Sequence, residues 1–349
     1  MDIFTSLVIP ALVGIGIGIL SGMLGIGGGT VLVPIFRLAF GMSPIMSTAT
    51  SLFTIIPTSV SGAVSHIRHK TCVPSLGLAA GLGGACTSPI GVWLATISPA
   101  WMVMLAAALT PGESVIENAA REPEILDLAA MLRSMGAGVE GAGNYALRVR
   151  GTNRLHGAEH TPIGDRIEAG TLLCASAASG GDVRVLGAQA AHLFMPLTVL
   201  RQMGARPCSD ADSIWLRGRA VNGVSVRTGA FPDFPTDLQA VFMAVMANAG
   251  AHSEIAETVF ENRFGHVPEL KRMGARIDID GSTAVVEGGR LRGASVEASD
   301  LRAGAALVIA AMCASGTTRL HGAQIIRRGY ENLDGKLNEL GADIVVNAK

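Results

Sequence analysis

The chain has 349 residues, of which 49% are hydrophobic and only 16% are charged, and its mean hydropathy is +0.43. Soluble globular proteins usually have about 25% charged residues, so the chain is a membrane protein or a mixture of membrane and soluble parts. Its net charge of −1, without a basic run, excludes the electrostatic footprint of a nucleic-acid-binding protein. The five cysteines lack paired or CxxC spacing, which argues against a disulfide framework and a structural zinc site. We expect no metal and no cofactor.

The first part of the chain has the composition of a membrane segment. The charged residues within 1–110 are Asp2, Arg37, Arg68 and Lys70. A membrane-spanning helix needs about 20 apolar residues, so the first two charge-free stretches each fit one crossing and the third has room for two short ones. A buried core helix is the alternative, but successive charge-free stretches leave no solvated face. The acidic residue at position 2 and the long apolar run do not fit a secretory signal peptide.

A glycine-rich segment, SGMLGIGGGTVLVP at 21–34, interrupts this apolar region. In lipid, broken backbone persists only where protein or a water-filled cavity satisfies it, and transporters place such breaks at anion-binding sites. The alternative is close helix packing through small residues. A dinucleotide-binding loop is excluded, because no acidic residue lies about 20 positions downstream to bind the ribose. The candidate anion path therefore consists of Gly25, Gly27, Gly28 and Gly29.

The same region resembles a known transporter family. The segments GIGGGTVLVP and STATSLFTIIPTSVSGAVSHIRH are similar to the first half of TauE/SafE-type sulfite exporters and anion permeases, over about residues 5–95. This resemblance implies a small organic or sulfur-containing anion as substrate, a lipid bilayer as partner and a location in the cell membrane. Family members have a second glycine-rich half, which this chain does not show. His66 and His69 flank Arg68, which favours a basic interfacial loop over a metal pair, and the positive-inside rule places that loop, and with it the C-terminal part, in the cytoplasm.

The remainder of the chain is a repeat. Four segments, MLRSMGAGVEG, VLRQMGARPC, ELKRMGARIDI and KLNELGADIVV, each predict a helix end, a Gly-Ala stop and then a strand. Their Gly-Ala pairs begin at Gly136, Gly204, Gly274 and Gly341, a period of roughly 68 residues. The three later copies are preceded by a predicted amphipathic helix entered through Asp165, Asp237 or Asp300, where an Asp can cap the free N–H groups.

The first copy of the repeat is incomplete at its start. The position equivalent to Asp300 is Thr96, and the sequence before it is membrane-like. We therefore place the seam near 96–103 and interpret 101–109 as the end of a soluble-type helix. The predicted domains are a transmembrane half-permease at 1–100, the last part of a first α/β domain at 103–160, and a second α/β domain of three repeats at 161–349.

The repeat region resembles the UDP-N-acetylglucosamine enolpyruvyl transferase (1-carboxyvinyltransferase) family, which is EPSP synthase-like. The motifs VIENAAREPEILDLA, GDRIEAGT, FPTDLQA, ETVFENRFGHVPELKRMGA, ASDLRA and RRGYENLDGKLNELGADI occur in the family's order over roughly 103–349. The resemblance implies a mixed fold class: a transmembrane helical part followed by an incomplete inside-out α/β barrel. It also implies phosphoenolpyruvate and UDP-N-acetylglucosamine as substrates, in peptidoglycan synthesis.

The resemblance also carries roles onto individual residues. Asp237 in FPTDLQA corresponds to the base that takes the proton of the sugar hydroxyl, although Asp165 and Asp300 occupy equivalent places and plain capping is the alternative. The planar guanidinium group of an arginine is well suited to binding a carboxylate or a phosphate group. Arg166 and Arg263 lie in matching motifs, where we expect structural ion pairs or a site role. The family has Asp where this chain has Arg327, which removes a partner of the arginine that follows. The predicted substrate-binding residues are Asp237, Val259, Asp300, Arg302 and Arg328.

Three interpretations stay open at this point. The first is a homologue of the transferase with little or no turnover, because the family's N-terminal Lys-Asn pair and its cysteine-bearing acid loop belong to the region that membrane sequence occupies here. The second is a half permease that pairs with another copy as a homodimer and carries a vestigial soluble module. The third is a non-functional chimeric gene product, since natural fusions usually join whole domains through exposed linkers.

Overall fold

The computed structural model describes residues 100–261 and 263–347, and the predicted transmembrane segment with Gly25, Gly27, Gly28 and Gly29 lies outside them. The chain divides into the units Met1–Ile97 and Ser98–Lys349. Over 100–261 and 263–347, no helix combines the length and the apolar character that crossing a bilayer requires.

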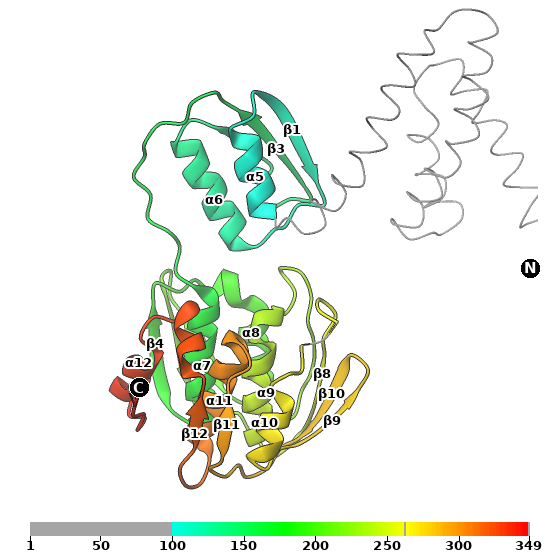
Figure 1. The fold of residues 1–349 in the computed structure, drawn as a ribbon, viewed down its shortest axis with the longest axis vertical. Coiled ribbons are helices and arrows are strands. Elements are labelled where there is room, and N and C mark those ends of the chain that lie inside the picture. The colour runs from blue at the N-terminus through cyan, green and yellow to red at the C-terminus, as the bar shows by residue number, and fades with distance from the viewer. Residues whose placement is uncertain (1–99, 262, 348–349) are drawn as a thin grey trace, which may run out of the picture. The chain divides into compact units, whose positions relative to one another are not determined.

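The first part of the second unit, here called the small lobe, holds two helices beside a three-stranded sheet (Figure 1). The sheet order is β1-β3-β2 and both pairings are antiparallel. Met104 and Ala108 on the first helix are fully buried in the lobe's own core, together with Val149. The predicted soluble-type helix at 101–109 thus corresponds to a nine-residue helix. The elements are α5 (Ala100–Ala108), β1 (Gly112–Glu117), α6 (Pro123–Ser134), β2 (Gly138–Glu140) and β3 (Ala146–Gly151).

The larger part, here called the large lobe, contains three successive repeats with a separate core. The first repeat comprises α7 (Arg166–Ser179), β4 (Asp182–Leu186), η2 (Ala190–Leu193), α8 (Phe194–Gln202), β5 (Arg206–Ser209) and β6 (Ser213–Arg217). The second comprises β7 (Ser225–Arg227), η3 (Thr236–Leu238), α9 (Gln239–Asn248), β8 (His252–Ala256), α10 (Val267–Arg272), β9 (Arg276–Asp280) and β10 (Thr283–Glu287). The third comprises β11 (Ser295–Glu297), α11 (Leu301–Cys313), β12 (Arg319–His321), η4 (Ala323–Arg328) and α12 (Leu333–Glu339).

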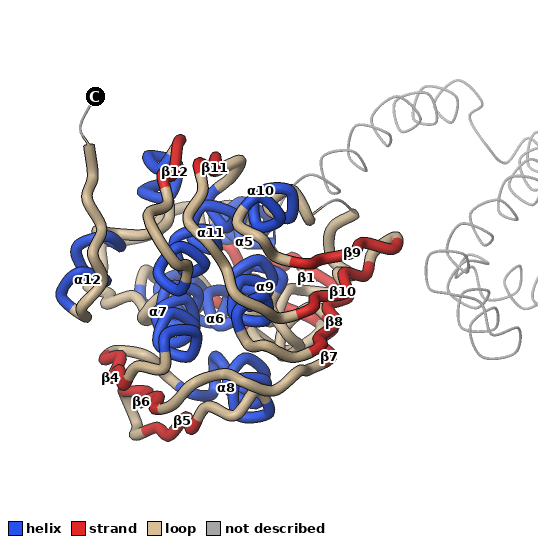
Figure 2. The backbone as a smooth tube through the Cα atoms, turned by 90° about the horizontal axis from the view of Figure 1, so that it is seen from below, coloured by secondary structure: helices blue, strands red, loops and turns tan. Residues whose placement is uncertain are grey.

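Helices form the centre of the large lobe and sheets its outside, as the inside-out barrel predicts (Figure 2). Helices α7, α9 and α11 pack against one another, and each is apolar nearly all round because it is covered on every side. Leu173, Phe242 and Leu307 from these helices are at most 1% exposed. The sheets have the orders β4-β6-β5, β7-β8-β10-β9 and β11-β12.

The Gly-Ala stops work as the sequence predicts. Gly136, Gly204, Gly274 and Gly341 all have φ between 92° and 105°, a left-handed conformation that glycine adopts without a Cβ penalty and that ends a helix. A strand follows the first three stops: β2, β5 and β9.

The predicted strand after the fourth stop is wrong. Residues 343–346 form no strand in the described part of the chain. Strands β2, β5 and β9 each pair with the next strand along the chain, and the described residues contain no such partner for 343–346. Instead the Asn338 side chain donates to the Ile344 carbonyl and accepts from the Ile344 N–H, both at 2.8 Å.

Candidate functional site

Three aspartates occupy equivalent positions in the repeats, but their side chains make different contacts. Asp165 accepts hydrogen bonds from the N–H groups of Ile167 and Glu168, so it caps α7. Asp300 caps α11 in the same way, through Arg302 and Ala303. Asp237 lies within the short helix η3 that precedes α9, and its side chain makes no capping bond. The sequence PTD adds this extra turn, which frees the Asp237 carboxylate from the helix end.

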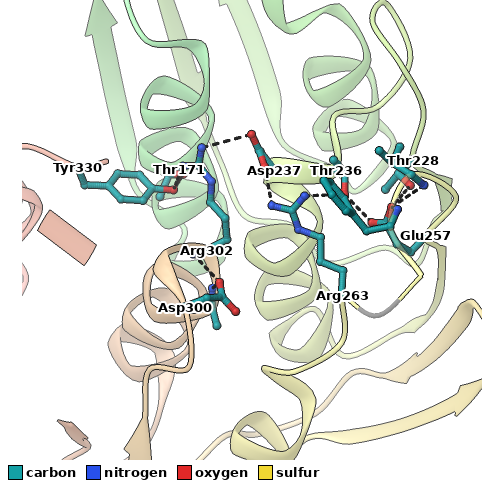
Figure 3. A network of polar contacts seen from close by, with 12 residues as sticks. Thr171, Thr228, Thr236, Asp237, Glu257, Arg263, Asp300, Arg302 and Tyr330 are labelled. Atoms are coloured by element: carbon teal, nitrogen blue, oxygen red, sulfur yellow. Dashed lines mark hydrogen bonds and ion pairs between the residues drawn. The ribbon is translucent and has the colours of Figure 1, made fainter. Parts of the chain in front are cut away.

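The Asp237 carboxylate lies between two guanidinium groups (Figure 3). Arg263 donates from Nη2 to Oδ1 at 2.6 Å, and Arg302 donates from Nη2 to Oδ2 at 3.4 Å. The exposed fractions of these side chains are 40% for Asp237, 24% for Arg263 and 17% for Arg302. The described residues bring no lysine or thiol into hydrogen-bonding contact with Asp237. The cluster is therefore a partly open arrangement of two positive charges around one negative charge, chemistry that suits an anionic ligand.

Tyr330 contacts the guanidinium of Arg302 and restrains it. Arg302 donates from Nη1 to the Tyr330 hydroxyl at 3.2 Å, and its guanidinium lies 5.5 Å from the centre of the Tyr330 ring. The Tyr330 hydroxyl also contacts Thr171 on α7 at 3.0 Å. Burial alone lowers the pKa of Arg302, but Tyr330 and Asp237 outweigh it and the pKa is raised. Burial also raises the pKa of Tyr330, so both groups keep their protons at neutral pH.

A buried carboxylate organises the other side of the cluster. Glu257, the residue after β8, is 2% exposed and accepts four hydrogen bonds. The donors are the hydroxyls of Thr228 and Thr236 and the backbone N–H groups of Val259 and Phe260, at 2.7–3.1 Å. Four donors are what a desolvated carboxylate needs.

The other residues singled out in the sequence make no hydrogen bond or ion pair with the Asp237 carboxylate. Arg166 forms an ion pair with Glu124 of the small lobe at 2.8 Å, which is the structural role considered for it. Val259 exposes 45% of its surface. Arg328, at the end of η4, is exposed, and its side chain makes no hydrogen bond or ion pair within 100–261 and 263–347. Asp300 is fully engaged in capping and in a contact with Ser299.

Neither Glu257 nor Tyr330 stands out in the sequence as a candidate site residue. Both lie in quoted motifs, ETVFENRF and RRGYENLDG, but neither pattern says that its side chain is buried. An acid directly after an alternating strand is usually solvated, so only the tertiary contacts with Thr228 and Thr236 reveal it.

The described ranges offer no candidate metal site, and two of their three cysteines are poor nucleophiles. These ranges contain no cluster of three or more His, Cys, Asp or Glu side chains that could hold a metal ion. Burial raises the pKa of the Cys174 thiol, and it raises the pKa of Cys313 to about 11. A cavity of about 360 Å³ between α7, β4 and α12, lined in part by Glu168, Val185 and Lys336, does not include Asp237.

Two family models match this chain, each over a different range of residues. The family model described as EPSP synthase (3-phosphoshikimate 1-carboxyvinyltransferase) matches residues 96–337, and the model described as sulfite exporter TauE/SafE matches residues 5–112. UDP-N-acetylglucosamine 1-carboxyvinyltransferase of Zymomonas mobilis is 49% identical over 243 residues, and the Azorhizobium caulinodans protein of that name is 50% identical over 244. Each alignment covers 69% of this chain and 57% of the relative. The chain thus spans less than two thirds of the length of these curated relatives.

Solved structures agree on the fold of the repeat region. The enolpyruvyl transferase NikO from Streptomyces tendae has a TM-score of 0.63 at 29% identity, covering 69% of this chain and 58% of NikO. EPSP synthase from Acinetobacter baumannii has a TM-score of 0.56 at 19% identity, covering 71% of this chain and 60% of that one, which supports the fold alone. With the central helices, the outer sheets and the family match over 96–337 together, the chain belongs to the EPSP synthase family.

Proposed function

We propose that the large lobe is a half-site of an enolpyruvyl transferase that binds UDP-N-acetylglucosamine and phosphoenolpyruvate. The observation that carries this proposal is the Asp237 carboxylate, which alone among the three equivalent aspartates leaves its helix end and meets Arg263 and Arg302. The identity of about 50% to proteins named UDP-N-acetylglucosamine 1-carboxyvinyltransferase supports this choice of substrates.

In this proposal each residue has one task. Asp237 takes the proton of the attacking sugar hydroxyl, and its contact with Arg263 holds its orientation. Arg302 and the exposed Arg328 bind the carboxylate and phosphate groups of phosphoenolpyruvate as cationic forks. Val259 contacts the nucleotide sugar with its exposed side chain. Asp300 acts on this site only by capping α11 and so placing Arg302. No cofactor is needed, because addition and elimination involve only proton transfer and charge stabilisation.

We propose further that this half-site turns over little or not at all by itself. Enolpyruvyl transfer needs an acid for the enol carbon, and the described residues place no thiol or lysine at Asp237. Losing a general acid typically lowers the rate by 10²- to 10⁴-fold, and losing part of the cleft lowers it further.

Two measurements on the purified full chain test the proposal. Calorimetric titration with UDP-N-acetylglucosamine should show binding, and Asp237→Ala should weaken it at least tenfold. Phosphate release from phosphoenolpyruvate in the presence of the sugar nucleotide should stay well below the usual enzyme range of about 1–10³ s⁻¹. Absence of any binding contradicts the half-site, whereas turnover within that range contradicts the loss of activity.

The TauE/SafE match supports a second, separate proposal for the N-terminal region. The family model covers residues 5–112, where the charged residues up to position 110 are few. We propose that this region associates with the cell membrane and keeps the repeat region on the cytoplasmic side, with the homodimeric half permease and the chimeric product as the remaining alternatives. Carbonate-resistant sedimentation with membranes supports insertion, and protease protection of the repeat region in inverted vesicles contradicts the orientation.

A further inference from the structure

Glu257 differs from the other carboxylates near the candidate site because it is almost completely buried, and it has no cationic partner among the described residues. All four of its bonds come from neutral donors, and the side chain is almost fully buried. A buried charge is costly unless it is fully hydrogen-bonded, so each of these donors is held firmly in place. This makes the carboxylate a fixed point to which two chain segments attach.

The first segment is the turn that carries Asp237. Arg263 donates from Nη1 to the Thr236 hydroxyl oxygen at 3.1 Å, and a guanidinium can only donate. The Thr236 hydroxyl therefore directs its own proton to Glu257 Oε2, at 2.7 Å. The order Arg263, Thr236, Glu257 is a one-way chain of donors that ends on the carboxylate (Figure 3).

The second segment is the turn after β8. Glu257 Oε1 accepts from the N–H groups of Val259 at 2.9 Å and Phe260 at 3.1 Å, which fixes the turn's backbone. The Phe260 ring lies 4.7 Å from the Arg263 guanidinium, in cation–π contact. Arg263 is therefore restrained twice by the same carboxylate, once through Thr236 and once through Phe260.

A further set of hydrogen bonds connects Glu257 to Thr228, the residue that follows strand β7. The Thr228 hydroxyl, next to β7, donates to Oε1 at 2.9 Å and accepts from the Thr258 N–H at 2.8 Å. The Thr258 hydroxyl in turn donates to the Thr228 carbonyl at 2.6 Å. These bonds connect the carboxylate to the framework, whereas the bonds of Thr236, Val259 and Phe260 connect it to the site.

We infer that Glu257 is a positioning residue that sets the Val259–Phe260 turn and the Asp237–Arg263 pair at a fixed separation, and thereby determines how tightly the sugar nucleotide binds. This inference rests on the proposed function for its ligand, but its geometric content concerns the free protein. A carboxylate that served only the fold would stabilise the lobe without coupling the two turns.

The test compares Glu257→Gln with two controls in the full chain. Gln keeps the shape but loses the charge and one acceptor, so Thr236 and Arg263 lose their fixed end point. Glu254→Gln changes an exposed carboxylate on β8, whose side chain is 49% exposed. Thr228→Val removes the framework bond and leaves the three site bonds in place.

We expect Glu257→Gln to weaken UDP-N-acetylglucosamine binding by about tenfold or more, the usual effect of losing a charge-assisted hydrogen bond. Glu254→Gln should leave the dissociation constant unchanged. Thr228→Val should lower the melting temperature but change the dissociation constant less than threefold. If Thr228→Val weakens binding as much as Glu257→Gln does, the carboxylate acts through the framework and the inference is wrong.

Amide hydrogen exchange gives a readout that needs no ligand. Glu257→Gln should accelerate exchange at Val259 and Phe260, and also around Asp237 and Arg263, while the amides of β10 keep their wild-type rates. Acceleration at Val259 and Phe260 alone, or equal acceleration throughout the lobe, overturns the inference. If the wild-type chain does not bind the sugar nucleotide, the proposed function fails, and the exchange pattern still decides whether Glu257 couples the two turns.

Discussion

At the scale of single residues, the Asp237 carboxylate competes with any anion for the guanidinium of Arg302. Asp237→Asn removes this negative charge while keeping the size of the side chain. Two unit charges 4 Å apart attract by about 4 kcal/mol near a protein surface, but solvent screening at this half-open site leaves a fraction of that.

We therefore expect Asp237→Asn to tighten phosphoenolpyruvate binding by about tenfold in a calorimetric titration, even though any transfer activity is lost. Asp233→Asn, an exposed acid in the same loop, serves as the control. Unchanged or weaker phosphoenolpyruvate binding in the Asp237→Asn variant contradicts the assignment of Arg302 to this ligand.

His266 is a second residue with a measurable signature. Burial is the main cause that lowers its pKa to about 4, while the charge of Asp300 opposes the shift and that of Arg263 favours it. The unfolded chain has a pKa near 6.5 for histidine and binds the proton more readily, so protonation favours unfolding. The contribution of neutral His266 to the free energy of unfolding is fully present above about pH 6.5. It is lost as the pH falls toward 4, and the loss amounts to about 3 kcal/mol.

Urea unfolding at a series of pH values checks this contribution. His266→Leu should flatten the fall in the free energy of unfolding between pH 6.5 and 4. His252→Gln should not, because His252 is exposed and its hydrogen bond with Glu287 raises its pKa. An equal pH slope in wild type and His266→Leu contradicts the prediction.

At the scale of helices, two aspartates cap and one does not, which gives a comparison within one lobe. Removing an N-cap costs about 1 kcal/mol of protein stability. Asp165→Ala and Asp300→Ala should each lower the free energy of unfolding by about that amount, whereas Asp237→Ala should lower it by a different route, since it leaves two arginines unpaired.

Chemical denaturation of the three variants measures the difference, and salt separates the two routes. The loss in Asp237→Ala should change with ionic strength, because unpaired charges repel and salt screens them. The losses in Asp165→Ala and Asp300→Ala should change less with ionic strength, because they come mainly from hydrogen bonds to the helix N–H groups. Identical salt dependence in all three variants contradicts the separation of roles seen in the structure.

The sequence predicts the helix ends but not the contacts of the candidate site, for physical reasons. Gly136, Gly204 and Gly274 mark local backbone events, because a left-handed residue after a helix depends on its neighbours alone. The orientation of Asp237 depends instead on Arg302, 65 residues away, and on the extra turn at Pro235. Position in the repeat could not distinguish the three aspartates, since the repeat predicts the same start for each helix. The glycines of the anion path lie outside the described residues, so their role stays a prediction.

At the scale of the whole molecule, two observations meet near residue 100. The two family models overlap at 96–112, a region that includes α5, and the curated relatives are matched over 57% of their length. The matches to the two families thus overlap along the sequence at the residues of α5.

We expect a fragment comprising Ser98–Lys349 to fold without the preceding residues, because described residues of this unit already form a buried core in each lobe. Circular dichroism and amide exchange of the purified fragment, compared with the full chain in detergent, check this expectation. A fragment that is unfolded, or whose central helices exchange freely, shows instead that the N-terminal region is needed for the fold.

The division of apolar side chains into two groups has a thermal consequence. The small lobe surrounds Met104 and Val149, and the large lobe surrounds Phe242 and Leu307, so neither group loses its packing when the other melts. A calorimeter should record a minor heat-absorption peak from the small lobe apart from the main one. No single midpoint temperature then describes the protein, and a substitution near Val149 should move one peak while leaving the other in place.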